Sequence, residues 1–290
     1  MQRLITGVVI GFCLAASWVT VGDEAPGGHL VLNGGGSKPE VVMKKFIELA
    51  GGAEGRIVVF PTASDESDTG EYYQELFGGY GCYNVAVAEV HTRDEAANPE
   101  LAAQVRAADG IWFSGGDQRR ITAALLDTIV GQAVAAAFEG GAIIGGTSAG
   151  TACQSPLMIT GDGDFTVITA DNIELGRGFG FFKDVIVDQH HVARRRNNRL
   201  ISVVLEHPQL IGVGVDEATA VWVRPDGTFE VLGDGWVVVY DASRATITRA
   251  PENRRGKPLG VHGLVTHVLL PGDVFDVQKR IVVSQRREAE

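Results

Sequence analysis

The sequence predicts an α/β protein with a mostly parallel sheet and helices on both faces of that sheet. Short apolar segments alternate with helical segments along the first half of the chain, and glycine-rich turns follow several of the apolar segments. Parallel strands need helical crossovers, so this alternation favours one continuous sheet. The 290 residues are 45% hydrophobic, which suffices for a sizeable core, and we expect a single domain over residues 28–290.

Each expected element has a local signal. Strands are expected at short runs of Val, Ile, Leu and Phe, in residues 29–33, 56–60, 84–90, 110–113, 142–144, 185–187 and 212–215. Helices are expected between them, in residues 39–50, 71–77, 98–108 and 121–138. A Pro-Asp-Gly turn predicts a hairpin of residues 220–223 and 228–232, with later strands in residues 236–240, 245–248 and 264–270. We expect the strands after residue 219 to extend the same sheet in antiparallel fashion.

The N-terminus is typical of a secretory signal peptide. Arg3 precedes an apolar run over residues 4–16, small residues follow, and polar residues begin at 22. We therefore assign residues 1–22 to a signal and expect a secreted or periplasmic protein, with a retained membrane anchor or a buried first strand as alternatives. Secretion permits a disulfide between Cys82 and Cys153, although the position of Cys153 on an expected helix favours a buried free thiol.

Charge and spacing argue against several classes of ligand. The formal net charge of −11 disfavours binding to nucleic acid. No Cys/His spacing indicates zinc, and the carboxylates of Asp162 and Asp164 have no histidine at ligand spacing. The glycine-rich turn at residues 33–37 lacks the spacing of a dinucleotide loop. We expect no metal and no cofactor, and a homodimer is left open.

A candidate nucleophile follows the expected strand at residues 142–144. Residues 145–150 (GGTSAG) place Ser148 between small neighbours, which a sharp strand-to-helix turn requires. The helix after the turn would direct free backbone N–H groups at the place where an oxyanion develops. The alternative is an ordinary glycine-rich turn.

Two more polar groups are expected at the same edge of the sheet. His190 follows the strand at 185–187, and Asp216 and Glu217 follow the strand at 212–215. Carboxyl ends of parallel strands gather at one edge, so His190 could take the Ser148 proton while a carboxylate orients the imidazole. Asp162 and Asp164 lie in a loop and are the alternative orienters, but a strand end is the stiffer platform.

Four motifs now occur in one order: residues 114–118 (SGGDQ), 146–150 (GTSAG), 188–190 (DQH) and 214–220 (GVDEATA). With them, residues 30–223 resemble the cyanophycinase and aspartyl-dipeptidase family of serine peptidases. The resemblance implies a flavodoxin-like fold related to class I glutamine amidotransferases. It also implies a catalytic triad of Ser148, His190 and Glu217, with an oxyanion hole formed by the backbone N–H groups of Gly116 and Ala149.

The cyanophycinase branch of this family has three arginines after its histidine, at the spacing Arg-x-Arg-x-x-Arg, and this chain matches it. Cyanophycin is a polyaspartate with arginine on each β-carboxyl group, and guanidinium forks suit carboxylates. The resemblance therefore implies a secreted peptidase that cuts cyanophycin into β-Asp-Arg dipeptides. The substrate-binding residues that it implies are Gln118, Asp188, Gln189, Arg194, Arg196 and Arg199.

Alternatives and departures accompany this interpretation. The arginines could form only a solvated helix start, and the enzyme could instead act on other Asp-containing or isopeptide-linked peptides. A non-catalytic binding protein would be free to lose the Ser, His and Glu that this chain keeps. Residues 151–156 (TACQSP) replace the Ala-rich run of the family, and His191 stands where an aromatic residue is more usual. Both departures could alter the substrate pocket.

Overall fold

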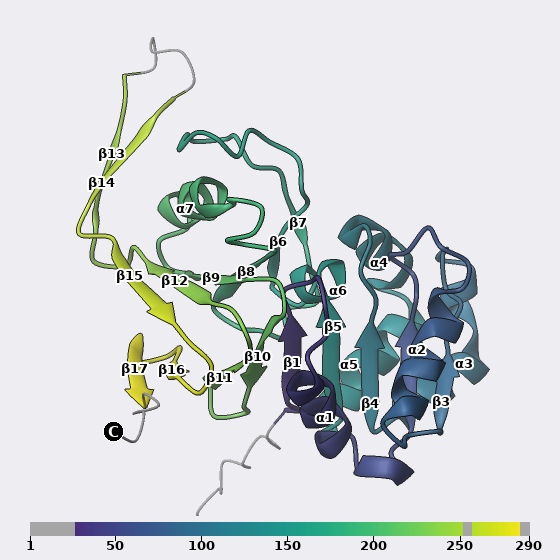
Figure 1. Cartoon of the computed structure of the whole chain (residues 1–290). Helices are drawn as coiled ribbons and strands as arrows, with labels where there is room; N and C mark the ends of the chain where they lie inside the picture. Colours follow the sequence, from purple (N-terminus) through teal and green to yellow (C-terminus); the bar gives the residue numbers. More distant parts are fainter. Residues whose placement is uncertain (1–26, 252–256, 285–290) are drawn as a thin grey trace, which may run out of the picture.

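The structure is a computed structural model that describes residues 27–251 and 257–284. Its main element is a nine-stranded sheet in the order β17-β16-β11-β10-β1-β5-β4-β2-β3 (Figure 1). The last five strands in this order, from β1 to β3, are parallel to one another, as the strand–helix alternation predicts. Their bounds are β1 Leu30–Asn33, β2 Ile57–Phe60, β3 Val85–Val87, β4 Gly110–Phe113 and β5 Ile143–Thr147.

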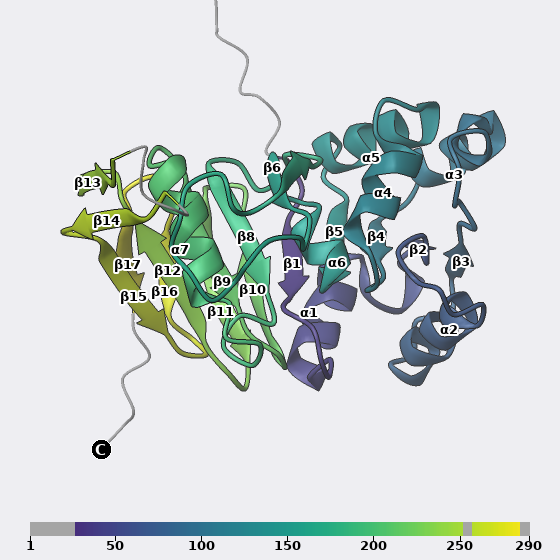
Figure 2. The ribbon, with the colours of Figure 1, turned by 90° about the horizontal axis from the view of Figure 1, so that it is seen from above.

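Helices cover both faces of this parallel half. Figure 2 shows α1 and α2 on one face and α3, α4 and α5 on the other. The bounds are α1 Glu40–Leu49, α2 Thr69–Gly79, α3 Pro99–Arg106, α4 Gln118–Leu125 and α5 Ile129–Glu139, with 3₁₀ turns η1 Gly52–Glu54 and η2 Glu95–Ala97. The mostly parallel sheet flanked by helices is therefore confirmed.

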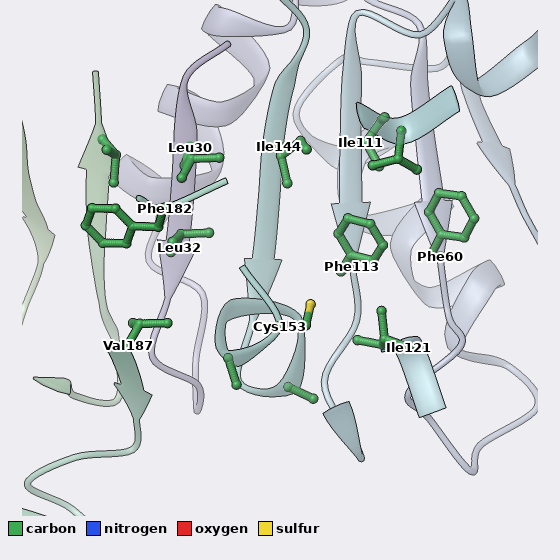
Figure 3. Close-up of a cluster of buried hydrophobic side chains, with 14 of the residues drawn as sticks. Leu30, Leu32, Phe60, Ile111, Phe113, Ile121, Ile144, Cys153, Phe182 and Val187 are labelled. Atoms are coloured by element: carbon green, nitrogen blue, oxygen red, sulfur yellow. The ribbon is translucent and has the colours of Figure 1, made fainter. Parts of the chain in front are cut away.

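The parallel strands β1, β5, β4 and β2 are buried on both faces, so their side chains alternate between two cores, whereas the edge strand β3 is only partly buried. On β2, Val58 and Phe60 join the core under α3, α4 and α5, whereas Ile57 and Val59 join the core under α1 and α2. Figure 3 shows part of the first core, where Phe60 stacks on Phe113 with ring centroids 5.2 Å apart. This packing fixes the heights at which the strands end, and hence the positions of the loops that follow them.

Antiparallel strands extend the first sheet beyond β1. Strand β10 pairs with β1, and β11, β16 and β17 follow in order, all antiparallel. Their bounds are β10 Thr219–Val223, β11 Thr228–Gly233, β16 Val274–Asp276 and β17 Ile281–Ser284. The expected hairpin around the Pro-Asp-Gly turn is confirmed.

A second sheet corrects the expectation that all later strands extend the first one. It has the order β15-β12-β9-β8, with β8 and β9 parallel, and α7 packs on it (Figures 1 and 2). The turn between β9 and β10 is sharp, with Ala218 at a φ of 53°, and it carries the chain from the second sheet into the first. The bounds are β8 Val185–Gln189, β9 Ile211–Val215, β12 Val237–Asp241, β15 Val265–Leu269 and α7 Asn197–Glu206.

The single helix expected at residues 121–138 is wrong, because α4 and α5 are separate helices. Asp127 has a φ of 62°, and the Thr128 hydroxyl caps the second helix by accepting the Gly131 N–H at 3.1 Å. An N-cap threonine is a signal for a helix start, but the continuous apolar periodicity favoured a single helix.

Small elements complete the fold: α6 Ala149–Ala152 and the two-stranded ribbons β6 Leu157–Ile159 with β7 Leu175–Arg177 and β13 Thr246–Arg249 with β14 Leu259–His262.

The expected signal peptide at residues 1–22 lies outside the described residues. Cys82 and Cys153 are both free and buried, and burial raises the pKa of each thiol. Among the described residues no single helix is long and apolar enough to cross a membrane; α4 and α5 meet that test only as a pair, across a bend of 100°.

Candidate active site

Ser148 occupies a strained turn between β5 and α6. Its φ of 52° and ψ of −107° lie outside the regions that non-glycine residues prefer, which is the geometry of a nucleophile elbow. A Cβ on Gly146 would lie 2.4 Å from the carbonyl oxygen of Gly150, so only glycine fits there. The Thr151 hydroxyl donates to the carbonyl oxygens of Asn33 at 2.6 Å and Gly146 at 3.0 Å. Thr151, one of the departures from the family pattern, therefore clamps the turn.

Ser148 is the first member of a chain of three side chains. Its Oγ lies 2.8 Å from Nε2 of His190, and Nδ1 of His190 lies 2.5 Å from Oε1 of Glu217. With its proton on Nδ1, the imidazole donates to Glu217 and accepts from the Ser148 hydroxyl. The arrangement can move a proton from the hydroxyl to the imidazole and stabilise the imidazolium that forms.

The environment of His190 keeps its imidazole neutral. Burial lowers the pKa of His190, and the charges of Arg194 and Arg196 lower it further. The hydrogen bond and charge of Glu217 raise the pKa but do not outweigh these effects. A neutral imidazole at neutral pH is the form that can accept the Ser148 proton.

The glycine-rich loop after β1 joins the elbow to the histidine. The Gly34 carbonyl accepts the His190 N–H at 2.7 Å, and the Gly35 carbonyl accepts the Ala218 N–H at 3.0 Å. A Cβ on Gly35 would lie 2.2 Å from Cε1 of His190. Asn33, which is fully buried, accepts the Gly35 N–H with its side chain at 2.8 Å and the Ser148 N–H with its carbonyl at 3.0 Å.

This role of Asn33 is not among the predictions from the sequence, in which residues 33–37 form only a tight turn. A polar residue at the end of an apolar strand, directly before three glycines, is nevertheless a usable signal. Thr147 supports the same residue by donating its hydroxyl to the Asn33 side chain at 2.9 Å. Asn33 therefore holds the turns that carry Ser148 and His190 at a fixed separation.

Two backbone turns flank Ser148 where an oxyanion would form. Ala149 is the first residue of α6, and the first N–H groups of a helix have no partner inside it. Gly116 lies in the turn after β4, which is tied to the β2 loop by a hydrogen bond from the Asp117 N–H to the Ala63 carbonyl at 2.9 Å. A Cβ on the neighbouring Gly115 would lie 3.6 Å from Cβ of Ser148, so this turn borders the nucleophile.

The three arginines of the Arg-x-Arg-x-x-Arg pattern have different surroundings. Arg194 is exposed, and its Nε lies 3.9 Å from Oε1 of Glu217. Arg196 is half-buried and donates from Nη1 to the backbone and side-chain oxygens of Gln189, while its Nε has no partner among the described residues. Burial, together with the charge of Arg199, lowers the pKa of Arg196 to about 10. Arg194 and Arg196 are therefore the arginines that border the Ser148–His190–Glu217 chain.

Asp188 and Arg199 form a buried ion pair instead. They are 1% and 0% exposed, and Nε of Arg199 donates to Oδ2 of Asp188 at 2.9 Å, with a second bond from Nη2 to Oδ1. Burial alone would raise the pKa of Asp188, but the attraction of Arg199 and the hydrogen bonds from His191 and Arg199 outweigh it and hold the pKa below its usual range. The expectation that both contact substrate stays a prediction; in the structure each pairs with the other, and neither side chain is exposed to solvent.

His191 belongs to the same buried group. Its Nδ1 lies 3.4 Å from Oδ2 of Asp188, and its ring meets Tyr240 edge to face with centroids 5.9 Å apart. Asp216 accepts the N–H groups of Val192 and Ala193 at 3.0 and 2.8 Å. Side chains of the second sheet and of the turn after β9 thus fix the turn that follows His190.

Gln118 is the first residue of α4 and is buried. Its Nε2 donates to the carbonyl oxygens of Ile159 and Thr160 at 2.8 and 2.7 Å, so its amide group holds the β6 segment.

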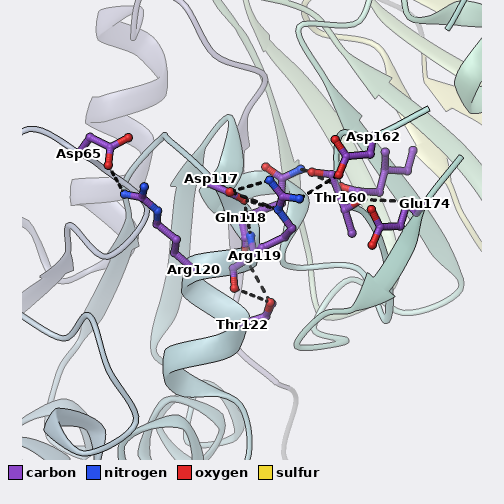
Figure 4. A network of polar contacts seen from close by, with 10 residues as sticks. Asp65, Asp117, Gln118, Arg119, Arg120, Thr122, Thr160, Asp162 and Glu174 are labelled. Atoms are coloured by element: carbon purple, nitrogen blue, oxygen red, sulfur yellow. Dashed lines mark hydrogen bonds and ion pairs between the residues drawn. The ribbon is translucent and has the colours of Figure 1, made fainter. Parts of the chain in front are cut away.

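Figure 4 shows Arg119 between Asp117 and Asp162, at 3.0 and 2.9 Å. Asp162 pairs with Arg119, and Asp164 accepts from Thr166, so neither of these carboxylates contacts His190. Among the residues that the structure describes, no group of three or more His, Cys, Asp or Glu could hold a metal ion.

The comparisons with known proteins agree with the fold and with the order of the motifs. The model of peptidase family S51 matches residues 30–231. The chain belongs to this family. It is therefore a serine-type peptidase.

Curated relatives and a solved structure are also similar to it. The chain is 36% identical over 259 residues to a cyanophycinase of Synechococcus elongatus, covering 87% of this chain and 80% of that protein. It is 34% identical over 255 residues to a cyanophycinase of Trichormus variabilis, covering 86% of each. The crystal structure of a peptidase from an acI-B1 actinobacterium shares the fold, with a TM-score of 0.60 at 24% identity, covering 81% of this chain and 94% of that one.

Proposed function

We propose that this peptidase is secreted and hydrolyses cyanophycin to β-Asp-Arg dipeptides through a Ser148–His190–Glu217 triad. The observation that carries the catalytic assignment is the continuous chain of contacts, 2.8 Å from Ser148 to His190 and 2.5 Å from His190 to Glu217. The substrate assignment is supported by the cyanophycinase relatives and by Arg194 and Arg196 beside these three residues.

The chemistry follows the usual steps of acyl transfer. The Ser148 hydroxyl oxygen attacks the scissile carbonyl carbon while its proton passes to Nε2 of His190. The negative oxygen that forms accepts hydrogen bonds from the backbone N–H groups of Gly116 and Ala149. His190 then gives the proton to the leaving amine, which departs and leaves an ester on Ser148. Water, deprotonated by His190, cleaves this ester and restores the enzyme.

The guanidinium groups of Arg194 and Arg196 provide recognition of the substrate. Each cyanophycin residue bears the α-carboxylate of its β-linked arginine, and charge-assisted hydrogen bonds from guanidinium to carboxylate are among the stronger polar contacts. Within this proposal Asp188 and Arg199 support the turn that carries these groups. Gln118 takes part by holding the β6 segment, and Gln189 takes part by accepting from the Arg196 guanidinium.

Secretion is the part of the proposal that depends on residues 1–22. Arg3 followed by the apolar run supports it. In the native host, the mature chain should be found in the periplasm or the medium, and its N-terminal residue should lie between residues 17 and 26. If only full-length protein is found, and only in the cytosol, secretion is contradicted, whereas the catalytic assignment is unaffected.

The direct test is to incubate the purified protein with cyanophycin granules and to identify the soluble products by mass spectrometry. We expect β-Asp-Arg dipeptides from the wild type and none from the Ser148→Ala variant. Release of dipeptide only from short Asp-containing or isopeptide-linked peptides would favour the alternative substrate class. Binding of the polymer without any release by wild type would favour a binding protein and overturn the proposal.

A further inference from the structure

A cavity of about 280 Å³ opens beside Ser148, away from the residues that are proposed to bind substrate. Its walls come from the loop before α1, the start of α2 and the turn after β4, and Ser148 and Thr147 close one end. Neither Gln118 nor any of the three arginines lines it. Figure 2 shows α1 and α2 on the same face of the first sheet, so the cavity lies over that face at the carboxyl ends of the strands.

Lys38 is the cation of this cavity. It is half-buried, with Nζ 5.2 and 5.4 Å from the ring centroids of Tyr72 and Tyr73 and 3.4 Å from the Tyr72 hydroxyl. It forms no ion pair with any residue that the structure describes. Lys44 and Lys45 on the adjoining helix, in contrast, pair with Glu40 and Glu48. The charge of Lys38 is thus held in place by aromatic rings and left without a carboxylate.

Hydroxyl groups line the cavity around this cation. Ser114 is 1% exposed, and its Oγ has no hydrogen-bond partner among the described residues. A buried hydroxyl without a partner is costly unless a ligand satisfies it. Oγ of Ser64 accepts the Glu66 N–H at 3.1 Å and lies 2.6 Å from the Thr69 hydroxyl, whose single proton can go either to Ser64 or to the Glu66 carbonyl at 3.0 Å. With the Thr69 proton directed at Ser64, the Ser64 hydroxyl has its own proton to donate to a ligand. One ammonium group and two hydroxyl donors form a set that suits a carboxylate.

From this arrangement we propose that the cavity is a second carboxylate-binding subsite, in which Lys38, Ser64 and Ser114 hold a free carboxylate of the substrate next to the scissile bond. The proposal rests on the proposed function, because it takes Ser148 as the nucleophile and a polyanionic peptide as the substrate. Cyanophycin offers two sources of this group: the α-carboxylate of a β-linked arginine and the α-carboxylate of the chain end. The subsite adds a second anchor, so the substrate is held on both sides of the nucleophile.

Steady-state kinetics with cyanophycin oligomers test the role of Lys38. Lys38→Gln should raise KM about 10- to 100-fold with kcat changed by less than about 3-fold, because a contact present in both ground and transition states is lost. Lys38→Arg should recover most of the loss. Ser114→Ala should give a smaller rise in KM in the same direction. Lys44→Gln is the matched control, since Lys44 lies on the outer side of α1 and pairs with Glu40; it should behave as wild type.

Two modified oligomers identify the carboxylate. In one, agmatine replaces each β-linked arginine, which removes the side-chain α-carboxylate and keeps the guanidinium; in the other, the chain end is amidated. The oligomer that lacks the bound carboxylate should have a high KM with wild type and no further rise with Lys38→Gln. If Lys38→Gln leaves KM unchanged, or raises KM equally for all three oligomers, the subsite is overturned.

A binding experiment separates failure of the subsite from failure of the proposed function. N-acetylaspartate, which carries the chain-end α-carboxylate, and Nα-acetylarginine, which carries the arginine α-carboxylate, are each titrated calorimetrically into the Ser148→Ala protein, which needs no turnover. Combining Ser148→Ala with Lys38→Gln should weaken binding at least about tenfold, and combining it with Lys44→Gln should not. Equal affinity of the Lys38 double variant, or no binding to any of the three, overturns the subsite. Absence of cyanophycin hydrolysis by wild type, with the binding pattern retained, overturns only the proposed substrate.

Discussion

The two sheets contribute to the site in different ways. The first sheet supplies the elbow and the turn after β4, and there hydrogen bonds to main-chain groups fix a strained turn. The Asn33 carbonyl accepts the Ser148 N–H, and the Thr151 hydroxyl donates to main-chain carbonyls on either side. The second sheet supplies His190 and Glu217, and there side chains set the geometry through the buried ion pair below His190. A backbone constraint tolerates little change, whereas a side-chain network can be weakened in steps.

This difference predicts a graded series of effects. Removing the one reacting atom on the first sheet should abolish turnover, whereas changes on the second sheet should reduce turnover, stability or the pH range by separable amounts. The following predictions run from the largest expected effect to the smallest.

Ser148→Ala should lower kcat by roughly 10⁵ to 10⁶, by analogy with the removal of nucleophiles from other triads. The fold should survive, since the only hydrogen bond of Oγ among the described residues is with His190. Turnover of cyanophycin and the melting temperature are the two measurements. Ser243→Ala, at an exposed position remote from the site, is the control. Residual turnover above about 1% of wild type would identify a different nucleophile.

Glu217→Gln should lower kcat by roughly 10² to 10⁴, because the amide no longer favours the productive tautomer or stabilises the imidazolium. Single-turnover kinetics on the same substrate measure the loss. Asp162→Asn removes an exposed carboxylate that pairs with Arg119 and should lose much less. If Asp162→Asn loses most of its kcat while Glu217→Gln keeps it, Asp162 and not Glu217 orients the imidazole.

Asp188→Asn should destabilise the protein by about 3–5 kcal/mol, because it leaves the charge of Arg199 buried without a partner. Chemical denaturation at neutral pH measures this loss. If the pair instead served mainly as a substrate contact, the variant would keep its unfolding free energy and lose only affinity. The pKa of Asp188 is held below its usual range, so the stability that the pair contributes is present above the unfolded pKa and is lost as pH falls through the folded pKa.

The sequence predicted most of the first sheet and the three side chains that meet at the candidate site. Strand runs, the glycine-rich elbow and the order Ser148, His190, Glu217 are local signals, and the structure brings the three side chains into contact. Because side chains alternate along a strand, only one of the two carboxylates after β9 was expected to face His190. Glu217 is that carboxylate, whereas Asp216 accepts N–H groups of the turn that follows His190.

What the sequence could not predict depends on contacts between distant segments. The Arg-x-Arg-x-x-Arg spacing does not tell which arginine is buried, because that depends on Asp188, which lies on a neighbouring strand end. The split into two sheets depends on the turn at Ala218, an alanine with no glycine signal for its left-handed conformation. The position of Lys38 in the cavity depends on Tyr72 and Tyr73 of α2, which lie against its ammonium group only in the folded chain.

Arg196→Ala should lower kcat/KM about tenfold to a hundredfold, mostly through KM, because a charge-assisted contact to a substrate carboxylate is lost. The side chain also holds Gln189, so the melting temperature should be measured alongside the kinetics. Arg195→Gln is the control, since Arg195 is exposed and belongs to the same turn. If Arg196→Ala and Arg195→Gln have the same kcat/KM, Arg196 has no role in recognition of the substrate.

The smallest effect expected is a shift of the pH profile in Arg194→Gln. Burial first, and then the charge of Arg194, lowers the pKa of His190, and a positive neighbour disfavours the imidazolium. Removing Arg194 should therefore raise the pKa of His190 and move the acid limb of kcat/KM, which reports the free enzyme, to higher pH. Added salt should move the acid limb of wild type the same way, because Arg194 is 54% exposed and its charge is screened, and should move that of the variant less. An acid limb that moves to lower pH, or does not move, would show that Arg194 does not tune the base; the second sheet would then contribute position without electrostatic control.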